Sequence, residues 1–459
     1  MLDFSLMAYK NEIIDDLCNL IRIDSVKSDA QSHMPYGKKV FEALMYMLNL
    51  AESLDLDNIN LFSRCGYVEY GEGVDIFVIL THLDVVPAGD GWTVPPFEGI
   101  YKDGRVYGRG AIDDKGAAVC ALYVLHALKE NCKSLNKRVR LIFGCDEESG
   151  WSDMEYYLNN TSERPVMAFS PDASFPVINS EKGMCQLIIE KSGYAADGKG
   201  IRLRELKGGE RINIVPDRAS AIIEGDSALL KEALDLFNEN TGYALKADVS
   251  GGELSVYAEG ISAHGAKPEE GRNALMMLVG FLNTLPMKKS PACDAIYKLS
   301  AFLDSDCFGK KLGIACSNKM GELTVNFGFA DITEESVKIG IDIRYPSCIT
   351  RDTIIDSVKK AFDGYSVSVK HELAPHYVPE DSELVKGLLN AYETVTGDKA
   401  YCVAMGGATY ARIFENSVAF GPLFPGDESL EHQANEYIDI DSLIKAGEVM
   451  AEAIMNLCT

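Results

Sequence analysis

Hydrophobic residues follow two alternating patterns along the first part of the chain. Apolar residues three and four positions apart predict helices over residues 11–23, 37–54, 115–130 and 154–160. Compact apolar runs predict buried strands within residues 74–87, 138–150 and 165–176. Strands that alternate with helices are typical of a parallel sheet with helices on both faces.

The pattern changes between about residues 186 and 379, where strand and helix signals are separated by hairpin-like polar breaks. Such a region indicates an α+β unit with antiparallel strands. Beyond it, the helix and strand pattern of the first part returns. We therefore predict an α/β protein. Its mixed, mostly parallel sheet is flanked by helices and formed by residues 1–185 and 380–459, and an inserted α+β domain of residues 186–379 interrupts it.

Length, charge and cysteine usage narrow the possible partners and locations. A chain of 459 residues exceeds the size at which one core stops growing, so two domains are expected. The formal net charge of -25 disfavours nucleic acid and anionic membranes, and we expect neither as a partner. The start shows no basic segment followed by an apolar one, no run of eighteen apolar residues occurs, and the twelve cysteines include no C-x-x-C pair. A cytoplasmic, reduced location is the expectation.

Histidine and acidic residues collect where the predicted strands of the first part end. His82 and Asp84 follow the first strand, and Asp172 follows the last. Because ligands bind at the carboxyl ends of the strands in an open α/β sheet, these side chains are expected to converge. The further members of the set are Asp113 and Asp114 in a glycine-rich loop, Asp146, Glu147 and Glu148 after the middle strand, and the late His432. So many acidic groups would repel one another without a cation, and a mixture of imidazole and carboxylate suits zinc or manganese.

Each of these residues also has a simple structural explanation when it is taken alone. A single aspartate after a strand is commonly a helix cap, and His82 alone could be a buried histidine with satisfied hydrogen bonds. The run "GRGAIDDKG" lacks the G-x-x-x-x-G-K-[ST] pattern of a phosphate-binding loop. The whole set is therefore more informative than any one member.

Five motifs in a fixed order carry a family resemblance. They are "THLDVV", "YGRGAIDDKG", "DEESG", "SPDASFP" and "EHQANE". In this order and with these gaps they resemble the M20 (carboxypeptidase G2-like) metallopeptidases, and within that superfamily the PepV-type dipeptidases. The resemblance runs over nearly the whole chain. It implies a catalytic two-metal domain of residues 1–185 and 380–459, a lid domain of residues 186–379, and two divalent ions per chain, Zn²⁺ or Mn²⁺ or else Co²⁺.

The resemblance implies a ligand set for these two ions. Asp113 would bridge them. His82 and Asp172 would complete the ligands of one ion. Glu148 and His432 would complete the ligands of the other.

Neighbours of these ligands would carry out the chemistry. Glu147 would act as general base and then as general acid on a water activated by the two ions. Asp84 would orient the His82 imidazole by accepting its other N–H group. In this family the peptide bond that joins Asp113 to Asp114 is cis, which would explain the adjacent aspartates. The simpler alternative is that Asp114 caps the following helix, and both explanations can hold together.

The inserted domain resembles the family's lid. The segment "GISAHGAKPEEGRNA" places His264 where the lid histidine stabilises the oxyanion of the tetrahedral intermediate. Asn213 in "INIVPDRA" stands at the position of a substrate-contacting asparagine. Arg344 in "IDIRYP" stands at that of an arginine that holds an anionic oxygen, with a strand-edge ion pair as the alternative. The insertion, about 190 residues long, resembles the longer PepV-type kind, which supplies the lid histidine from the same chain. This resemblance favours a monomer, with a dimer as the alternative.

A glycine loop in "AMGGATYAR" would bind the free carboxylate of the substrate through its backbone N–H groups. Its residues are Gly406, Gly407 and Ala408. Ala408 departs from the family pattern, in which a third glycine stands at this position.

The leading hypothesis is a cytoplasmic, metal-dependent dipeptidase that hydrolyses free dipeptides between its two domains. One alternative is an M20 amidohydrolase that acts on N-acyl amino acids or on longer peptides. Asp153, after "DEESGW", could distinguish the two by binding the free ammonium group of a dipeptide. A second alternative is a non-catalytic binding protein that has kept the fold. It is disfavoured because every expected ligand and the general base are present.

Overall fold

The computed structural model describes residues 4–131, 134–193, 200–303 and 306–459, which form two compact units. Unit 1 comprises Met1–Ser180, Tyr377–Val403 and Ala408–Thr459, and unit 2 comprises Glu181–His376 and Ala404–Gly407. Within the described ranges, no helix is both long and apolar enough to cross a membrane.

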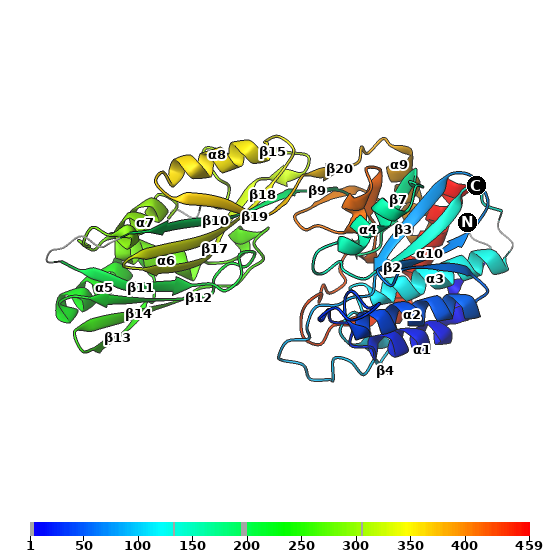
Figure 1. The fold of residues 1–459 in the computed structure, drawn as a ribbon, viewed down its shortest axis with the longest axis horizontal. Coiled ribbons are helices and arrows are strands. Elements are labelled where there is room, and N and C mark those ends of the chain that lie inside the picture. Colours follow the sequence, from blue (N-terminus) through cyan, green and yellow to red (C-terminus); the bar gives the residue numbers. More distant parts are fainter. Residues whose placement is uncertain (1–3, 132–133, 194–199, 304–305) are drawn as a thin grey trace. The chain divides into compact units, whose positions relative to one another are not determined.

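Unit 1 is built on a mixed sheet, so the predicted fold class is confirmed (Figure 1). Its strands lie in the order β1 (Asp57–Leu61), β2 (Cys65–Tyr70), β6 (Arg138–Gly144), β3 (Ile76–His82), β7 (Met167–Ser170), β22 (Ser417–Ala419) and β9 (Val177–Glu181). The four strands from β6 to β22 run parallel, whereas β1, β2 and β9 pair antiparallel. The carboxyl ends of β3, β6 and β7 therefore meet at one edge of the sheet.

Helices cover both faces of this sheet. One face packs on α1 (Lys10–Ile21), α2 (Lys38–Ser53), α3 (Lys115–Glu130), α9 (Glu383–Thr396) and α10 (Ile440–Cys458). The other face packs on α4 (Ser152–Asn160) and the short helix η3 (Tyr410–Ile413). Strand β3 shows the alternation directly, because Phe77 and Ile79 enter the first core and Val78 and Leu80 enter the second. A strand buried on both sides reads as a continuous apolar run, as the sequence predicts.

Short elements in unit 1 bring late segments of the chain beside early ones. Strands β4 (Ile100–Lys102), β5 (Arg105–Tyr107) and β24 (Tyr437–Asp439) form a small sheet, and β8 (Ala173–Ser174) pairs with β23 (Pro422–Leu423). The helix η1 (Leu6–Tyr9) precedes α1. The pairing of β24 with β5 lays the segment after His432 against the start of the loop that carries Asp113.

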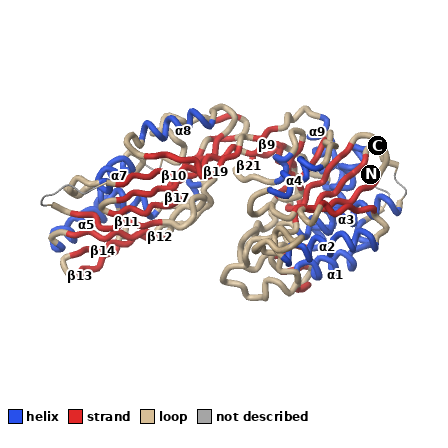
Figure 2. Tube along the Cα trace, viewed as in Figure 1, coloured by secondary structure: helices blue, strands red, loops and turns tan. Residues whose placement is uncertain are grey.

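Unit 2 consists of an antiparallel sheet with helices on one face (Figure 2). The strand order is β13 (Lys246–Ser250), β14 (Glu253–Glu259), β12 (Arg218–Glu224), β11 (Arg202–Gly208), β17 (Thr324–Thr333), β18 (Ser336–Tyr345), β10 (Gly183–Ser192) and β19 (Ser366–Leu373). The covering helices are α5 (Ser227–Thr241), α6 (Ala274–Asn283), α7 (Pro291–Ser300) and α8 (Arg351–Ala361). The smaller elements are η2 (Pro268–Glu270), β15 (Ser317–Asn318) and β16 (Gly321–Glu322), with β20 (His376–Tyr377) and β21 (Cys402–Met405) where the chain passes between the units.

Candidate functional site

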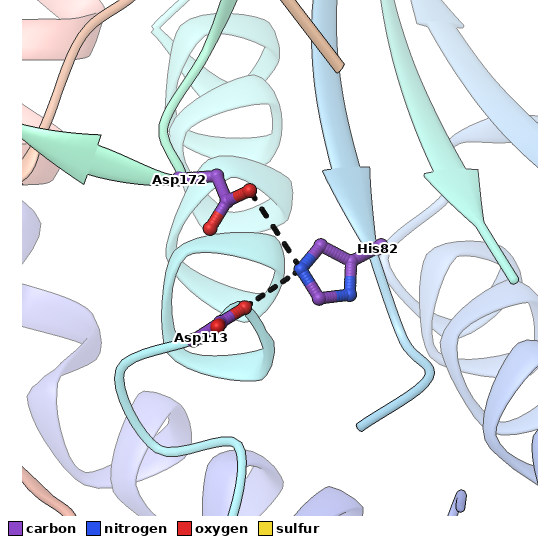
Figure 3. A group of neighbouring side chains, drawn as sticks. All are labelled: His82, Asp113 and Asp172. Carbon is purple, nitrogen blue, oxygen red and sulfur yellow. Dashed lines mark hydrogen bonds and ion pairs between the residues drawn. The ribbon is translucent and has the colours of Figure 1, made fainter. Parts of the chain in front are cut away.

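Three ionisable side chains of unit 1 converge at the carboxyl edge of its sheet (Figure 3). His82 is the last residue of β3, Asp172 follows β7, and Asp113 lies in the loop before α3. One ligand atom from each lies within 4.8 Å of the others, and we call these residues the first group. The His82 Nε2 atom lies 2.8 Å from Asp113 Oδ1 and 3.8 Å from Asp172 Oδ2.

The hydrogen bonds of His82 determine which of its two ring nitrogens carries a hydrogen. Its Nδ1 atom lies 2.9 Å from the backbone carbonyl oxygen of Asp84, which can only accept. The Nδ1 atom therefore carries a hydrogen, and Nε2 of the neutral imidazole is an acceptor that faces two carboxylate acceptors. Three acceptors pointed at one another require a proton or a metal cation among them, so the residues fit a metal ion.

A second group shares Asp113 with the first. It consists of Asp113, Glu148 and His432, whose ligand atoms again lie within 4.8 Å of one another. The His432 Nε2 atom is 3.0 Å from Asp113 Oδ2 and 3.0 Å from Glu148 Oε1. One oxygen of Asp113 thus faces the first group and the other faces the second.

Burial, the neighbouring charges and hydrogen bonding shift the pKa values of the site residues. Burial, followed by the charge of Asp113, raises the pKa of Asp172 to about 7. Burial and the charge of Asp172 raise the pKa of Glu147 well above its ordinary value. Burial acts to lower the pKa of His432, but its hydrogen bonds to Asp113 and Glu148 prevail and raise it to about 11. The two groups of residues therefore favour positive charge between them. Imidazole and carboxylate groups are common ligands of divalent ions such as zinc and manganese.

The Asp84 side chain does not make the expected hydrogen bond to the His82 imidazole. Its carboxylate lies 3.5 Å from His82 Nδ1, farther than its own backbone carbonyl. The two carboxylate oxygens instead accept the backbone N–H groups of Glu147 and Glu148, each at 3.1 Å. Asp84 therefore orients the imidazole mainly through its main chain, while its side chain fixes the turn that carries the two glutamates.

The adjacent residues Asp113 and Asp114 make different contacts. The peptide bond between Asp113 and Asp114 is cis, which confirms that prediction. Asp114 stands at the N-cap position of α3 but makes no side-chain capping hydrogen bond. Its Oδ2 atom accepts the backbone N–H of His82 at 3.2 Å. The capping alternative is therefore wrong, because the carboxylate is turned toward β3.

Asp153 lies beneath the site and is completely buried. Its Oδ2 atom accepts hydrogen bonds from Cys145 N at 2.6 Å, Asp146 N at 3.1 Å and the Tyr410 hydroxyl at 2.5 Å. An ammonium-binding role is therefore wrong for Asp153, since its oxygens face protein donors and not solvent. The Tyr410 ring packs edge-on to His82 with a centroid distance of 6.2 Å. Sequence reasoning missed Tyr410, although it belongs to the quoted run "AMGGATYAR".

Unit 2 brings together two of the expected lid residues. Ile214, beside Asn213, forms an antiparallel bridge with His264, and Gly265 N donates to the Asn213 carbonyl at 2.7 Å. The His264 Nδ1 atom accepts the N–H of Ala266 at 3.2 Å. The neutral His264 imidazole therefore carries its hydrogen on Nε2, the tautomer that can donate to an oxyanion.

Arg344 of unit 2 is buried and already paired. Its guanidinium donates to the Asp342 carboxylate at 3.1 Å and, through Nη1, to the Gly406 carbonyl at 2.8 Å. The ion pair considered as the alternative is thus present, but on an inner strand, because β18 pairs with both β17 and β10. Gly406 and Gly407 belong to unit 2, whereas Ala408 belongs to unit 1. The expected glycine loop therefore crosses from one unit to the other.

Comparisons with known proteins agree on one family. The sequence profile described as "Peptidase family M20/M25/M40" matches residues 78–456. "Putative dipeptidase YtjP" of Bacillus subtilis (strain 168) is 38% identical over 456 residues, which cover 98% of this chain and 97% of that protein. A Staphylococcus epidermidis protein described as "Putative dipeptidase" is 35% identical over 462 residues, with 98% of each chain covered.

Solved structures share the fold at low sequence identity. Human carnosine dipeptidase 1 has a TM-score of 0.60 at 14% identity, with 98% of this chain and 97% of that chain covered. The M20 family metallo-carboxypeptidase Sso-CP2 from Sulfolobus solfataricus has a TM-score of 0.59 at 17% identity, with 97% and 99% covered.

Proposed function

The chain belongs to peptidase family M20/M25/M40 and is a metallopeptidase, and from this premise we propose that it hydrolyses free dipeptides with two divalent ions. The observation that carries the proposal is the sharing of Asp113, which turns one oxygen to His82 and the other to His432 and Glu148. A bridging carboxylate flanked by two imidazole and carboxylate sets fits a pair of zinc, manganese or cobalt ions. Asp172 completes the first set.

The ions would supply Lewis acidity, which polarises the scissile carbonyl and makes a water molecule more acidic. In the proposal, the Glu147 carboxylate takes a proton from the attacking water and donates it to the nitrogen of the leaving amine. Its position is supported by Asp84, which holds the backbone N–H groups of Glu147 and Glu148. His264 would stabilise the oxyanion through its Nε2–H group.

Five further residues would hold the substrate. Asn213 and Arg344 would contact the substrate from a lid domain of residues 186–379, and the loop of Gly406, Gly407 and Ala408 would receive its free carboxylate. Arg344 would fix this loop through the Gly406 carbonyl, a role that its contacts support. A dipeptide substrate is supported by the dipeptidase descriptions of relatives at 38% and 35% identity. We further propose that the enzyme acts as a cytoplasmic monomer.

The test is hydrolysis of free dipeptides, tripeptides and N-acetylated amino acids by chelator-stripped protein, with Mn²⁺, Zn²⁺ or Co²⁺ added back separately. Cleavage restored by metal and confined to dipeptides is the expected result. Glu147→Gln is the matched variant: it should bind metal as the wild type does and lose at least about 100-fold in turnover. Cleavage of acetylated substrates alone would replace the proposal by an acylase activity. Metal uptake without any cleavage would replace it by a binding function.

A further inference from the structure

Glu436 is a completely buried carboxylate four residues after His432. Its Oε1 atom accepts the backbone N–H of Ile112 at 2.9 Å and that of Asp113 at 3.4 Å. Its Oε2 atom accepts the backbone N–H of Gly110 at 3.1 Å and Arg109 Nη1 at 2.5 Å. All four donors belong to the loop that ends in the shared ligand Asp113.

The backbone of Glu436 also contacts this loop. Its carbonyl oxygen accepts the N–H of Gly108 at 3.0 Å, and the next residue begins the strand pairing of β24 with β5. Gly108 and Gly110 have φ values of 154° and 87°, so this loop takes a path that regular secondary structure cannot stabilise. Glu436 supplies the acceptors that a helix or a strand would otherwise provide.

We propose that Glu436 is a positioning residue that sets the place of Asp113 relative to His432 and thereby tunes the affinity for both metal ions. This inference rests on the proposed two-ion function. Asp113 turns one oxygen to each group, so a displaced loop would weaken both ion sites together. Glu148, by contrast, belongs to the second group alone, and its loss would act on one site.

A purely structural ion pair with Arg109 is the competing explanation. Arg109 is buried, donates to the Ala88 carbonyl at 3.2 Å and stacks its guanidinium 5.3 Å from the Trp92 ring. It accounts for one of the four contacts that the Glu436 side chain makes, while the other three go to the loop backbone. If only the pair mattered, Glu436 variants would lower stability and leave metal affinity unchanged.

Calorimetric titration of Zn²⁺ or Mn²⁺ alone into the chelator-stripped full chain separates the two explanations. In Glu436→Gln, the amide nitrogen cannot accept a hydrogen bond, so one side of the loop loses its acceptor in either amide orientation. We expect both ions to bind at least about tenfold more weakly, as is typical when a group that orients a metal ligand is removed. Wild-type affinity for both ions in this variant would overturn the proposal.

Two further variants keep the test decisive. Asp16→Asn is the matched control, because Asp16 accepts the hydroxyl groups of Tyr46 at 2.7 Å and Tyr123 at 2.6 Å within the same unit. It should lower the melting temperature and bind both ions as the wild type does. If Glu436→Gln does not fold, Glu436→Asp keeps the charge beside Arg109 but is one methylene too short for all four contacts. Weaker binding of both ions is again expected, and unchanged binding overturns the proposal.

The calorimetric metal titration also distinguishes this inference from the proposed function. A wild-type protein that binds two ions without cleaving dipeptides would overturn the dipeptidase proposal and leave the Glu436 test intact. Wild-type protein that takes up fewer than two ions would overturn both.

Discussion

Replacing Tyr410 by phenylalanine removes one hydroxyl group from a buried carboxylate and should make the stability of unit 1 more sensitive to pH. The hydroxyl donates to Asp153 Oδ2 at 2.5 Å, and both side chains are completely buried. Burial raises the pKa of Asp153 to about 7, and the Tyr410 hydrogen bond opposes this rise by favouring the ionised form. The variant should therefore have an Asp153 pKa above that of the wild type.

The direction of the pH dependence follows from the pKa of Asp153 in the folded and the unfolded state. The pKa of folded Asp153 exceeds the unfolded value, so this group stabilises the fold at low pH and loses that contribution as the pH rises to about 7. In Tyr410→Phe the loss continues to a higher pH. Below about pH 6 the cost of the substitution is that of one neutral hydrogen bond, about 1 kcal/mol. Each additional unit of pKa adds about 1.4 kcal/mol at higher pH, so the cost should reach about 2–3 kcal/mol near pH 9.

Tryptophan fluorescence during urea unfolding measures this effect in unit 1 alone. The chain has two tryptophans, Trp92 and Trp151, and both lie in unit 1. Chelator is present throughout, so that metal binding does not add its own pH dependence. Tyr157→Phe is the matched control, because that buried hydroxyl interacts with Arg140 at 2.8 Å, a partner that keeps its charge throughout this range. A cost for Tyr410→Phe that stays equal from about pH 6 to pH 9, as in the control, would refute the reasoning.

Three further substitutions test other parts of unit 1. Asp113→Asn should weaken both metal sites in a calorimetric titration, whereas Asp172→Asn should weaken one; an Asp113 variant that keeps one tight site would contradict a shared ligand. Gly144→Ala should cost about 1–3 kcal/mol in urea unfolding, because its Cβ would lie 2.4 Å from the Tyr410 ring, while Gly150→Ala, with its nearest atom 3.6 Å away, should be neutral; equal stabilities would disprove the clash. Arg140→Met should cost about 2–3 kcal/mol, because the buried Tyr157 hydroxyl loses its partner and the partly exposed Glu69 and Glu163 keep only Arg138, whereas the more exposed Arg138→Met should cost about 1 kcal/mol or less; similar losses would show that burial does not decide the effect.

Amphipathic helices and buried strands could be predicted well where the local pattern is strong. The helix predicted over residues 115–130 coincides with Lys115–Glu130, and the one predicted over 37–54 exceeds Lys38–Ser53 by one residue at each end. Strands β10 and β17 were not predicted individually, although each pairs with a strand on both sides in the unit 2 sheet. Each depends on partners far away in the sequence, since β10 pairs with β18 and β19, and β17 pairs with β11 as well as with the following β18. Strand propensity reflects such partners more than the local residues.

The candidate ligands could be found from the sequence because parallel strands deliver them to one edge. His82 ends β3 and Asp172 follows β7, and because these strands are adjacent and parallel, the convergence of the two residues needs no long-range information beyond the sheet. The contact of His432 with Asp113 depends instead on the pairing of β24 with β5, two three-residue strands without a pattern of their own. The family resemblance supplied that contact, and local periodicity did not.

Five acidic residues near the site fall into two classes that look identical in the sequence. Asp84, Asp153 and Glu436 direct both carboxylate oxygens to backbone N–H groups, so they fix the loops and turns around the site and have no oxygen left for an ion. Asp113 and Asp172 face imidazole and one another, and this is the arrangement that needs a cation. The distinction depends on which backbone donors happen to be unpaired nearby, a property of the folded loops alone. In this site a buried acid therefore stays available for a cation only where the surrounding main chain offers its carboxylate no unpaired N–H group.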